Sequence, residues 1–90
     1  MKFKPGKIHL TRGIYHTITE SESFAQFVYT SLQRHLQSDW GECCSEDARA
    51  NETALERSGR LFSVYQGEEK IWIITEWDRY ATTVLYPEEY

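Results

Sequence analysis

The chain has 90 residues, of which 40% are hydrophobic, 27% charged and 14% aromatic, and its formal net charge is −4. This length predicts one domain, and the acidic balance disfavours nucleic acid as a partner because phosphates repel it. No apolar run approaches the roughly 20 residues that cross a bilayer, so we expect a cytoplasmic protein with no membrane partner.

The charge is spread unevenly along the chain. Residues 1–12 contain Lys2, Lys4, Lys7 and Arg12 and no acid, whereas residues 39–56 contain six acids and one arginine. The basic residues are consistent either with solvated side chains or with a phosphate contact.

The first 18 residues show a period-2 pattern that predicts a strand. Ile8 and Leu10 alternate with polar residues, and a second alternation runs from Ile14 to Ile18. Gly13 interrupts the pattern, which is typical of a bulge. We therefore expect one strand with a break, or a hairpin.

Residues 20–37 carry the spacing of an amphipathic helix. Thr19 and Glu22 fit a capping box at its start, with Thr19 as N-cap. The apolar face is interrupted by a histidine and consists of Phe24, Phe27, Val28, Ser31, Leu32, His35 and Leu36. A second helix is expected to begin after Ser45, as its N-cap, and to end at Gly59. Its sparse inner face includes Asp47 and Asn51.

Three strands are expected at residues 61–65, 70–77 and 81–86, where β-branched and aromatic residues are frequent. The connections are short, with a hairpin turn at 66–69, so an antiparallel meander is predicted. The middle strand is apolar on both faces, which is typical of a central strand. The predicted fold is α+β: two helices packed on an antiparallel sheet, with this C-terminal meander and an N-terminal strand or hairpin.

His35 is the one histidine whose position the pattern defines, at the centre of the helical apolar face. A histidine there is more often a hydrogen-bonded core residue than a proton-transfer group, since no serine or cysteine stands at a defined spacing to use it. Asp39, Asp47 and Asn51 are the expected partners. Asp47 and Asn51 are also expected to tie the 38–45 loop to the sheet through Arg60 or Arg79.

Two groups of acids are candidate metal sites. Asp39, Glu42, Glu46 and Asp47 lack the alternation of a calcium loop, so helix capping and solvation explain them better. Glu76 and Asp78 resemble half of a nuclease metal site, but no lysine follows two residues later.

The adjacent pair Cys43 and Cys44 lacks a second ligand pair and is a poor zinc site. We therefore predict no cofactor and no metal. The candidate binding residues are Asp39, Trp40, Glu42, Asp47, Asn51 and Arg79.

Several segments together resemble a family of small bacterial proteins of plasmids and integrative elements, called "plasmid-related" and sometimes labelled as type I restriction subunits. The similar segments are SLQRH (31–35), DWG (39–41), ED (46–47), RLFSVY (60–65), IWIITE (71–76), DR (78–79), TTVL (82–85) and PEEY (87–90), with Asn51, Ala54 and Leu55. The similarity extends from about residue 7 to Tyr90. Cys43, Cys44 and Trp77 depart from the family pattern.

The resemblance implies an accessory protein of a mobile element, and it implies no active-site residues. A chain of this length is too short for a methyltransferase domain. Because aromatic residues are abundant and no catalytic set is present, we expect a non-catalytic domain that binds another protein, encoded by the host or by the element. Inhibition of restriction or CRISPR defence is the function it suggests. A small metal-dependent hydrolase is the alternative, and the oligomeric state stays open.

Overall fold

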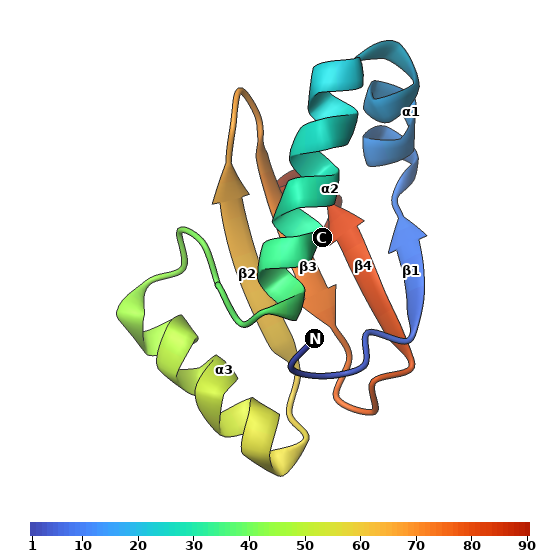
Figure 1. Ribbon diagram of the computed structural model, residues 1–90. Coiled ribbons are helices and arrows are strands. Elements are labelled where there is room, and N and C mark those ends of the chain that lie inside the picture. Colours follow the sequence, from blue (N-terminus) through green and yellow to red (C-terminus); the bar gives the residue numbers. More distant parts are fainter.

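The computed structural model describes residues 1–90, which form three α-helices and a four-stranded sheet (Figure 1). In chain order the elements are β1 (Lys7–Leu10), α1 (Arg12–Glu20), α2 (Glu22–Leu36), α3 (Ser45–Arg57), β2 (Leu61–Gln66), β3 (Lys70–Thr75), β4 (Ala81–Leu85) and a 3-10 helix, η1 (Pro87–Glu89). The predicted α+β class is confirmed. No helix has the length and apolar character needed to cross a membrane.

The sheet has the strand order β1-β4-β3-β2. Strands β2, β3 and β4 form the predicted antiparallel meander, and β3 is a central strand as expected. Strand β1, however, pairs in parallel with β4, so the sheet is mixed rather than antiparallel. A parallel pair needs a long crossover, and here three helices and two strands lie between β1 and β4. The local sequence pattern of β1 carries no information about so distant a partner.

The prediction of a strand or hairpin for the first 18 residues is wrong beyond β1, because residues 12–20 form helix α1. Ile14 is fully buried, and Thr17 and Ile18 are half-buried on the same side. The spacing i, i+4 between Ile14 and Ile18 is common to a helix and a strand, whereas Thr17 at i+3 shares their side only in a helix. Burial of Ile14 against the sheet favours the helix.

The start of α1 is stabilised by a side chain from the other end of the sequence. Glu89 accepts hydrogen bonds from the Thr11 hydroxyl, from the Gly13 N–H at 3.0 Å and from the Tyr86 N–H at 2.9 Å. A carboxylate at a helix N-terminus is favoured by the helix dipole. A Cβ at Gly13 would lie 2.6 Å from Glu89 Oε2, so Gly13 makes room for this contact and is not a bulge.

Helix α2 is confirmed within two residues of its predicted ends. Its N-cap is Ser21, whose hydroxyl accepts from the Phe24 N–H at 3.1 Å, rather than Thr19. Helix α3 also matches, but its N-cap is Cys44, and Ser45 is the first helical residue. The left-handed residue that ends α3 is Ser58, with φ 59°, rather than Gly59.

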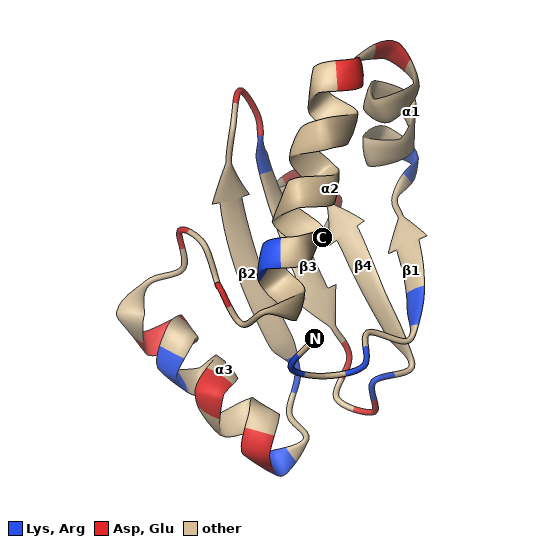
Figure 2. Cartoon of the chain, viewed as in Figure 1, with Lys and Arg blue, Asp and Glu red and all other residues tan.

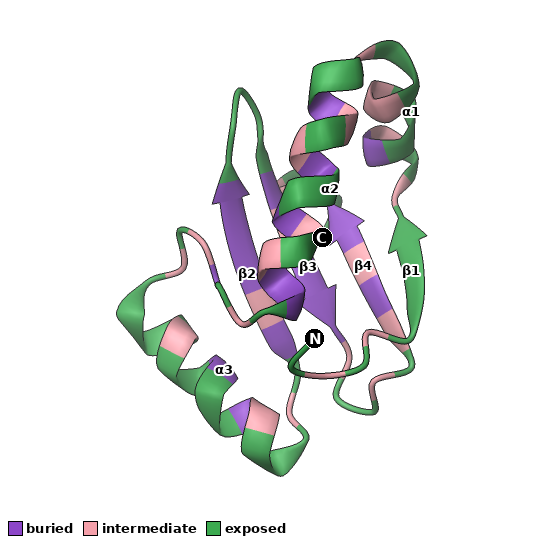
Figure 3. Cartoon of the chain, in the orientation of Figure 1, coloured by how far each residue is buried: buried purple, intermediate pink, exposed green.

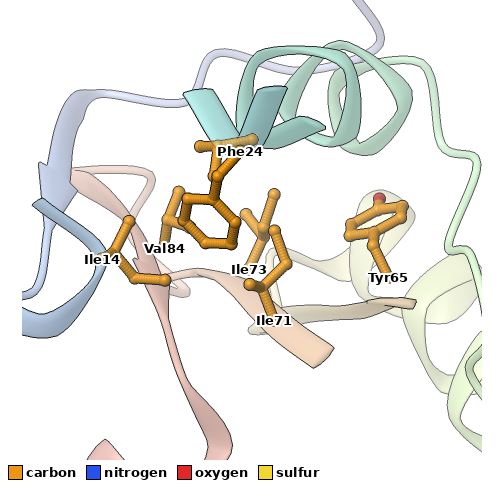
Figure 4. Close-up of a cluster of buried hydrophobic side chains, with 7 residues drawn as sticks. Ile14, Phe24, Tyr65, Ile71, Ile73 and Val84 are labelled. Atoms are coloured by element: carbon orange, nitrogen blue, oxygen red, sulfur yellow. The ribbon is translucent and has the colours of Figure 1, made fainter. Parts of the chain in front are cut away.

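The main core lies between the sheet and the two helices α1 and α2 (Figure 4). Phe24 from α2 and Ile14 from α1 meet Ile71, Ile73 and Val84 of the sheet. Figure 3 shows the buried residues concentrated on β2, β3 and β4 and on the sheet-facing side of α2, whereas β1 is exposed throughout. A smaller cluster of Trp40, Ala54 and Leu61 attaches α3 to the end of the sheet.

Candidate functional site

Strand β3 points large apolar side chains to both faces of the sheet. Ile71 and Ile73 belong to the main core, while Trp72 and Ile74 lie on the opposite face. There Trp72 is opposite Val64 and Ile74 is opposite Phe62 on β2. Phe62, Trp72 and Tyr90 form an aromatic cluster on this opposite face.

A hollow of about 250 Å³ opens on that face and is lined by Asp47, Arg60, Phe62, Trp72, Ile74 and Tyr90. We call it the aromatic hollow. The Trp72 ring packs edge-on against Phe62, with centroids 5.0 Å apart, and against Tyr90, with centroids 5.7 Å apart. Both Phe62 and Trp72 are only half-buried, and Tyr90 is exposed. Accessible rings grouped in a hollow suit insertion of a partner side chain.

The charges around the aromatic hollow are partly compensated. Arg60 donates to the Tyr90 hydroxyl at 2.7 Å, lies over the Tyr90 ring and pairs with Glu76 at 3.5 Å. Asp47 makes no salt bridge or side-chain hydrogen bond in the structure. The lining therefore includes one fixed cation, whose charge Glu76 balances, and one free carboxylate.

His35 lies in a buried chain of polar side chains. Its Nδ1 contacts the Ser63 hydroxyl, its Nε2 lies 2.9 Å from Thr75 Oγ1, and Thr75 Oγ1 lies 2.7 Å from Thr82 Oγ1. Thr82 in turn donates to the Pro5 carbonyl at 2.7 Å. We call Ser63, His35, Thr75, Thr82 and the Pro5 carbonyl the polar chain.

The single proton of each hydroxyl determines the direction of every bond in the polar chain. Thr82 donates to Pro5, so Thr75 must donate to Thr82. Thr75 then accepts from His35, which must carry its proton on Nε2. The neutral ring therefore accepts from Ser63 at Nδ1. The arrangement satisfies every buried group with one tautomer.

The polar chain contains a serine–histidine contact, but its setting does not suit nucleophilic catalysis. His35, Ser63, Thr75 and Thr82 have no more than 1% of their surface exposed. Burial, together with the charge of Arg79, lowers the pKa of His35 to about 3, which makes it a weak base at neutral pH. The expectation that His35 is a structural core residue is supported, although its partners are Ser63 and Thr75 rather than Asp39, Asp47 or Asn51.

Asn51 is buried and pairs with the backbone of β2. Its amide donates to the Phe62 carbonyl at 2.6 Å and accepts from the Phe62 N–H at 3.0 Å. Two such bonds to one residue imitate a neighbouring strand. Asn51 therefore ties α3, rather than the 38–45 loop as expected, to the sheet, and neither Arg60 nor Arg79 takes part in this pairing.

Arg79 stabilises the end of α3. Its guanidinium donates to the carbonyls of Gly59 at 2.6 Å, Ala54 at 3.1 Å and Glu76 at 3.0 Å, and lies over the Phe3 ring. These contacts satisfy carbonyls at a helix C-terminus. The structure therefore gives Arg79 a structural role.

Two of the remaining candidate residues, Asp39 and Trp40, are also engaged within the domain. Asp39 forms two hydrogen bonds with Arg34, at 2.8 and 3.1 Å, and these lower the pKa of its carboxyl group. Trp40 is 7% exposed and donates to Glu52 at 2.8 Å. The six candidate binding residues are therefore dispersed, and only Asp47 lines the aromatic hollow.

The acids and thiols do not assemble into a metal centre. No three His, Cys, Asp or Glu side chains are grouped so that they could hold a metal ion. Asp78 accepts from the Tyr80 N–H at 3.1 Å within the β3–β4 turn. Burial raises the pKa of Cys43 to about 11, and Cys43 and Cys44 are free thiols.

Phe62, Trp72, Ile74 and Tyr90 were not predicted as site residues. The two-sided apolar alternation of β3 is the signal that points to Trp72 and Ile74, whereas no local pattern brings Phe62 of β2 and the last residue, Tyr90, to them. Comparisons with protein-family models, with curated proteins and with solved structures found no match to this chain.

Proposed function

We propose that this domain is a non-catalytic accessory protein of a bacterial mobile element, which binds another protein through the aromatic hollow. The observation that carries the proposal is the grouping of Phe62, Trp72 and Tyr90 around an open hollow of about 250 Å³. Tryptophan and tyrosine are the residue types that contribute most to protein interfaces. The resemblance to plasmid-related proteins suggests a host defence enzyme, of restriction or CRISPR type, as the target.

The test is affinity capture from a bacterial host lysate, with three forms of the protein compared by quantitative mass spectrometry. Wild type should retain a specific partner, and Trp72→Ala should lose most of it. Trp77→Ala is the matched control, because Trp77 is an exposed tryptophan that does not line the hollow. Capture of no partner, or equal capture by wild type and Trp72→Ala, contradicts the proposal.

The acidic surface of α3 supports a basic target. Glu46, Asp47, Glu52 and Glu56 lie on this helix next to the hollow-forming β2 strand (Figure 2). Charges of this kind accelerate association and lose their effect as salt is added. Asp39 is a poor contributor because Arg34 neutralises it.

Charge should therefore act through Glu42, Glu46 and Asp47 rather than through Asp39. Changing these three to neutral amides should slow association with the captured partner several-fold at low salt. A rate that is unchanged in that variant and independent of salt contradicts a basic target for this surface.

A further inference from the structure

The two edges of the sheet differ in whether their backbone groups are paired. At the β2 edge, Asn51 satisfies both backbone groups of Phe62. The loop between α2 and α3 satisfies Val64, which donates to the Trp40 carbonyl at 3.2 Å and accepts from the Glu42 N–H at 2.7 Å. This edge is closed to a further strand.

The β1 edge is open. Lys7 donates to the Tyr80 carbonyl at 2.9 Å and Thr11 to the Val84 carbonyl at 3.1 Å, so these residues point their N–H groups toward β4. In a parallel ladder alternate residues point the opposite way. The backbone groups of Ile8 and Leu10 therefore face outward, and no element lies beyond β1 (Figure 1).

The side chains of β1 are also available. All four residues are exposed, and Ile8 and Leu10 have 44% and 38% of their surface accessible. An open strand edge with accessible apolar side chains is a site where another chain can add a strand. Native proteins usually protect such edges, as this one does at β2.

The two faces of β1 differ in chemistry. Ile8 and Leu10 are in register with Thr82 and Val84, which point toward the helices, while Lys7 and His9 are in register with Ala81 and Thr83 on the other face. Residues 1–12 contain four basic residues and no acid. An added strand would thus meet apolar side chains on one face and positive charge on the other.

We propose that β1 binds an extended segment of a partner protein in which apolar and acidic residues alternate, and that this segment adds as a fifth strand beside β1. The apolar residues pack on Ile8 and Leu10, and the acidic residues approach Lys7. A second copy of this chain fits less well, because pairing β1 with itself brings the basic residues of both copies together. The β1 edge is separate from the aromatic hollow, so either proposal can fail without the other.

The probe is a fluorescein-labelled octapeptide of alternating valine and glutamate, measured by fluorescence anisotropy at low and high salt. It should bind wild type, more weakly as salt is added, and the same peptide with lysine in place of glutamate should not bind. Ile8→Pro removes one outward N–H without breaking the ladder to β4, and should weaken binding at least about fivefold. As a single change, Lys7→Glu should weaken binding more than Ile8→Pro does. Lys70→Glu on β3 makes the same charge change away from β1, so as the matched control it should leave binding unchanged.

Backbone hydrogen exchange measured by NMR gives a readout that does not depend on any variant. In the free protein the amides of Ile8 and Leu10 should exchange fast, and the valine–glutamate peptide should slow both. Unchanged exchange at these two amides, or equal binding of the glutamate and lysine peptides, overturns the proposal. A protein dimer that Ile8→Pro abolishes also overturns it, because the edge would then belong to a second copy.

Discussion

The polar chain around His35 predicts how the stability of the domain depends on pH. Burial lowers the pKa of His35 from 6.5 to about 3 in the folded protein, whereas in the unfolded chain the side chain is exposed to water. Between these two values the unfolded state binds a proton that the folded state does not. The stability that the neutral His35 contributes is therefore fully present above pH 6.5, and it is lost progressively as the pH falls toward 3.

The magnitude follows from the same pKa values. Each pH unit inside this window changes the free energy of unfolding by about 1.4 kcal/mol. Acidification from pH 6.5 to pH 5 should thus cost about 2 kcal/mol, a large part of the stability of a small domain. Asp39 and Glu89 have lowered carboxyl pKa values, so they add to the loss only at lower pH, near and below the ordinary range of carboxylates.

The assay is urea unfolding at pH 7.0, 6.5, 6.0, 5.5 and 5.0, about half a pH unit apart across the upper part of the His35 window, followed by tryptophan fluorescence. The variant is His35→Gln, whose amide nitrogen can donate and whose amide oxygen can accept a hydrogen bond, but which does not titrate. It should be less stable than wild type at pH 7 and should show a much smaller slope above pH 5. His16→Gln is the matched control, because the His16 side chain is 71% exposed and lies outside the polar chain.

Two results would show that His35 does not cause a pH dependence of stability. One is a flat wild-type profile between pH 6.5 and pH 5, and the other is an equal slope in wild type and His35→Gln. His35→Ala gives a second check at pH 7, where a cavity and two unpaired hydroxyls should cost roughly 2–4 kcal/mol. A loss below about 0.5 kcal/mol would instead be typical of a solvent-facing group.

Three further predictions concern local features and use the same unfolding assay. Ser38 has φ 66° and a buried hydroxyl without a partner, so Ser38→Gly should stabilise by about 1 kcal/mol, and a loss of stability would show that the left-handed conformation is not strained. Glu89→Gln should destabilise by about 1 kcal/mol because a neutral amide accepts more weakly at the start of α1, and an equal loss at pH 7 and pH 3 would argue against a role for its charge. Asn51→Leu should cost roughly 1–3 kcal/mol, since it leaves both backbone groups of Phe62 unpaired, and the opened β2 edge should promote association detectable by light scattering.

The elements with a strong local pattern were predictable from the sequence alone. The long apolar face from Phe24 to Leu36 defined α2 and placed His35 in the core, and both are confirmed. The β-branched and aromatic runs with short turns defined the meander, and the two-sided alternation around Trp72 defined the central strand. In each case neighbouring residues carry the information, because side chains recur at the period of the element.

Contacts between distant segments were decided only by the tertiary structure. Helix α1 forms because Ile14 is buried against the sheet and Glu89 reaches its N-terminus across almost the whole chain. The parallel pairing of β1 with β4, the partners of His35 and the imitation of a strand by Asn51 have the same origin. A spacing along the chain specifies which face a residue occupies, but the atom it meets there belongs to a segment that only folding brings close.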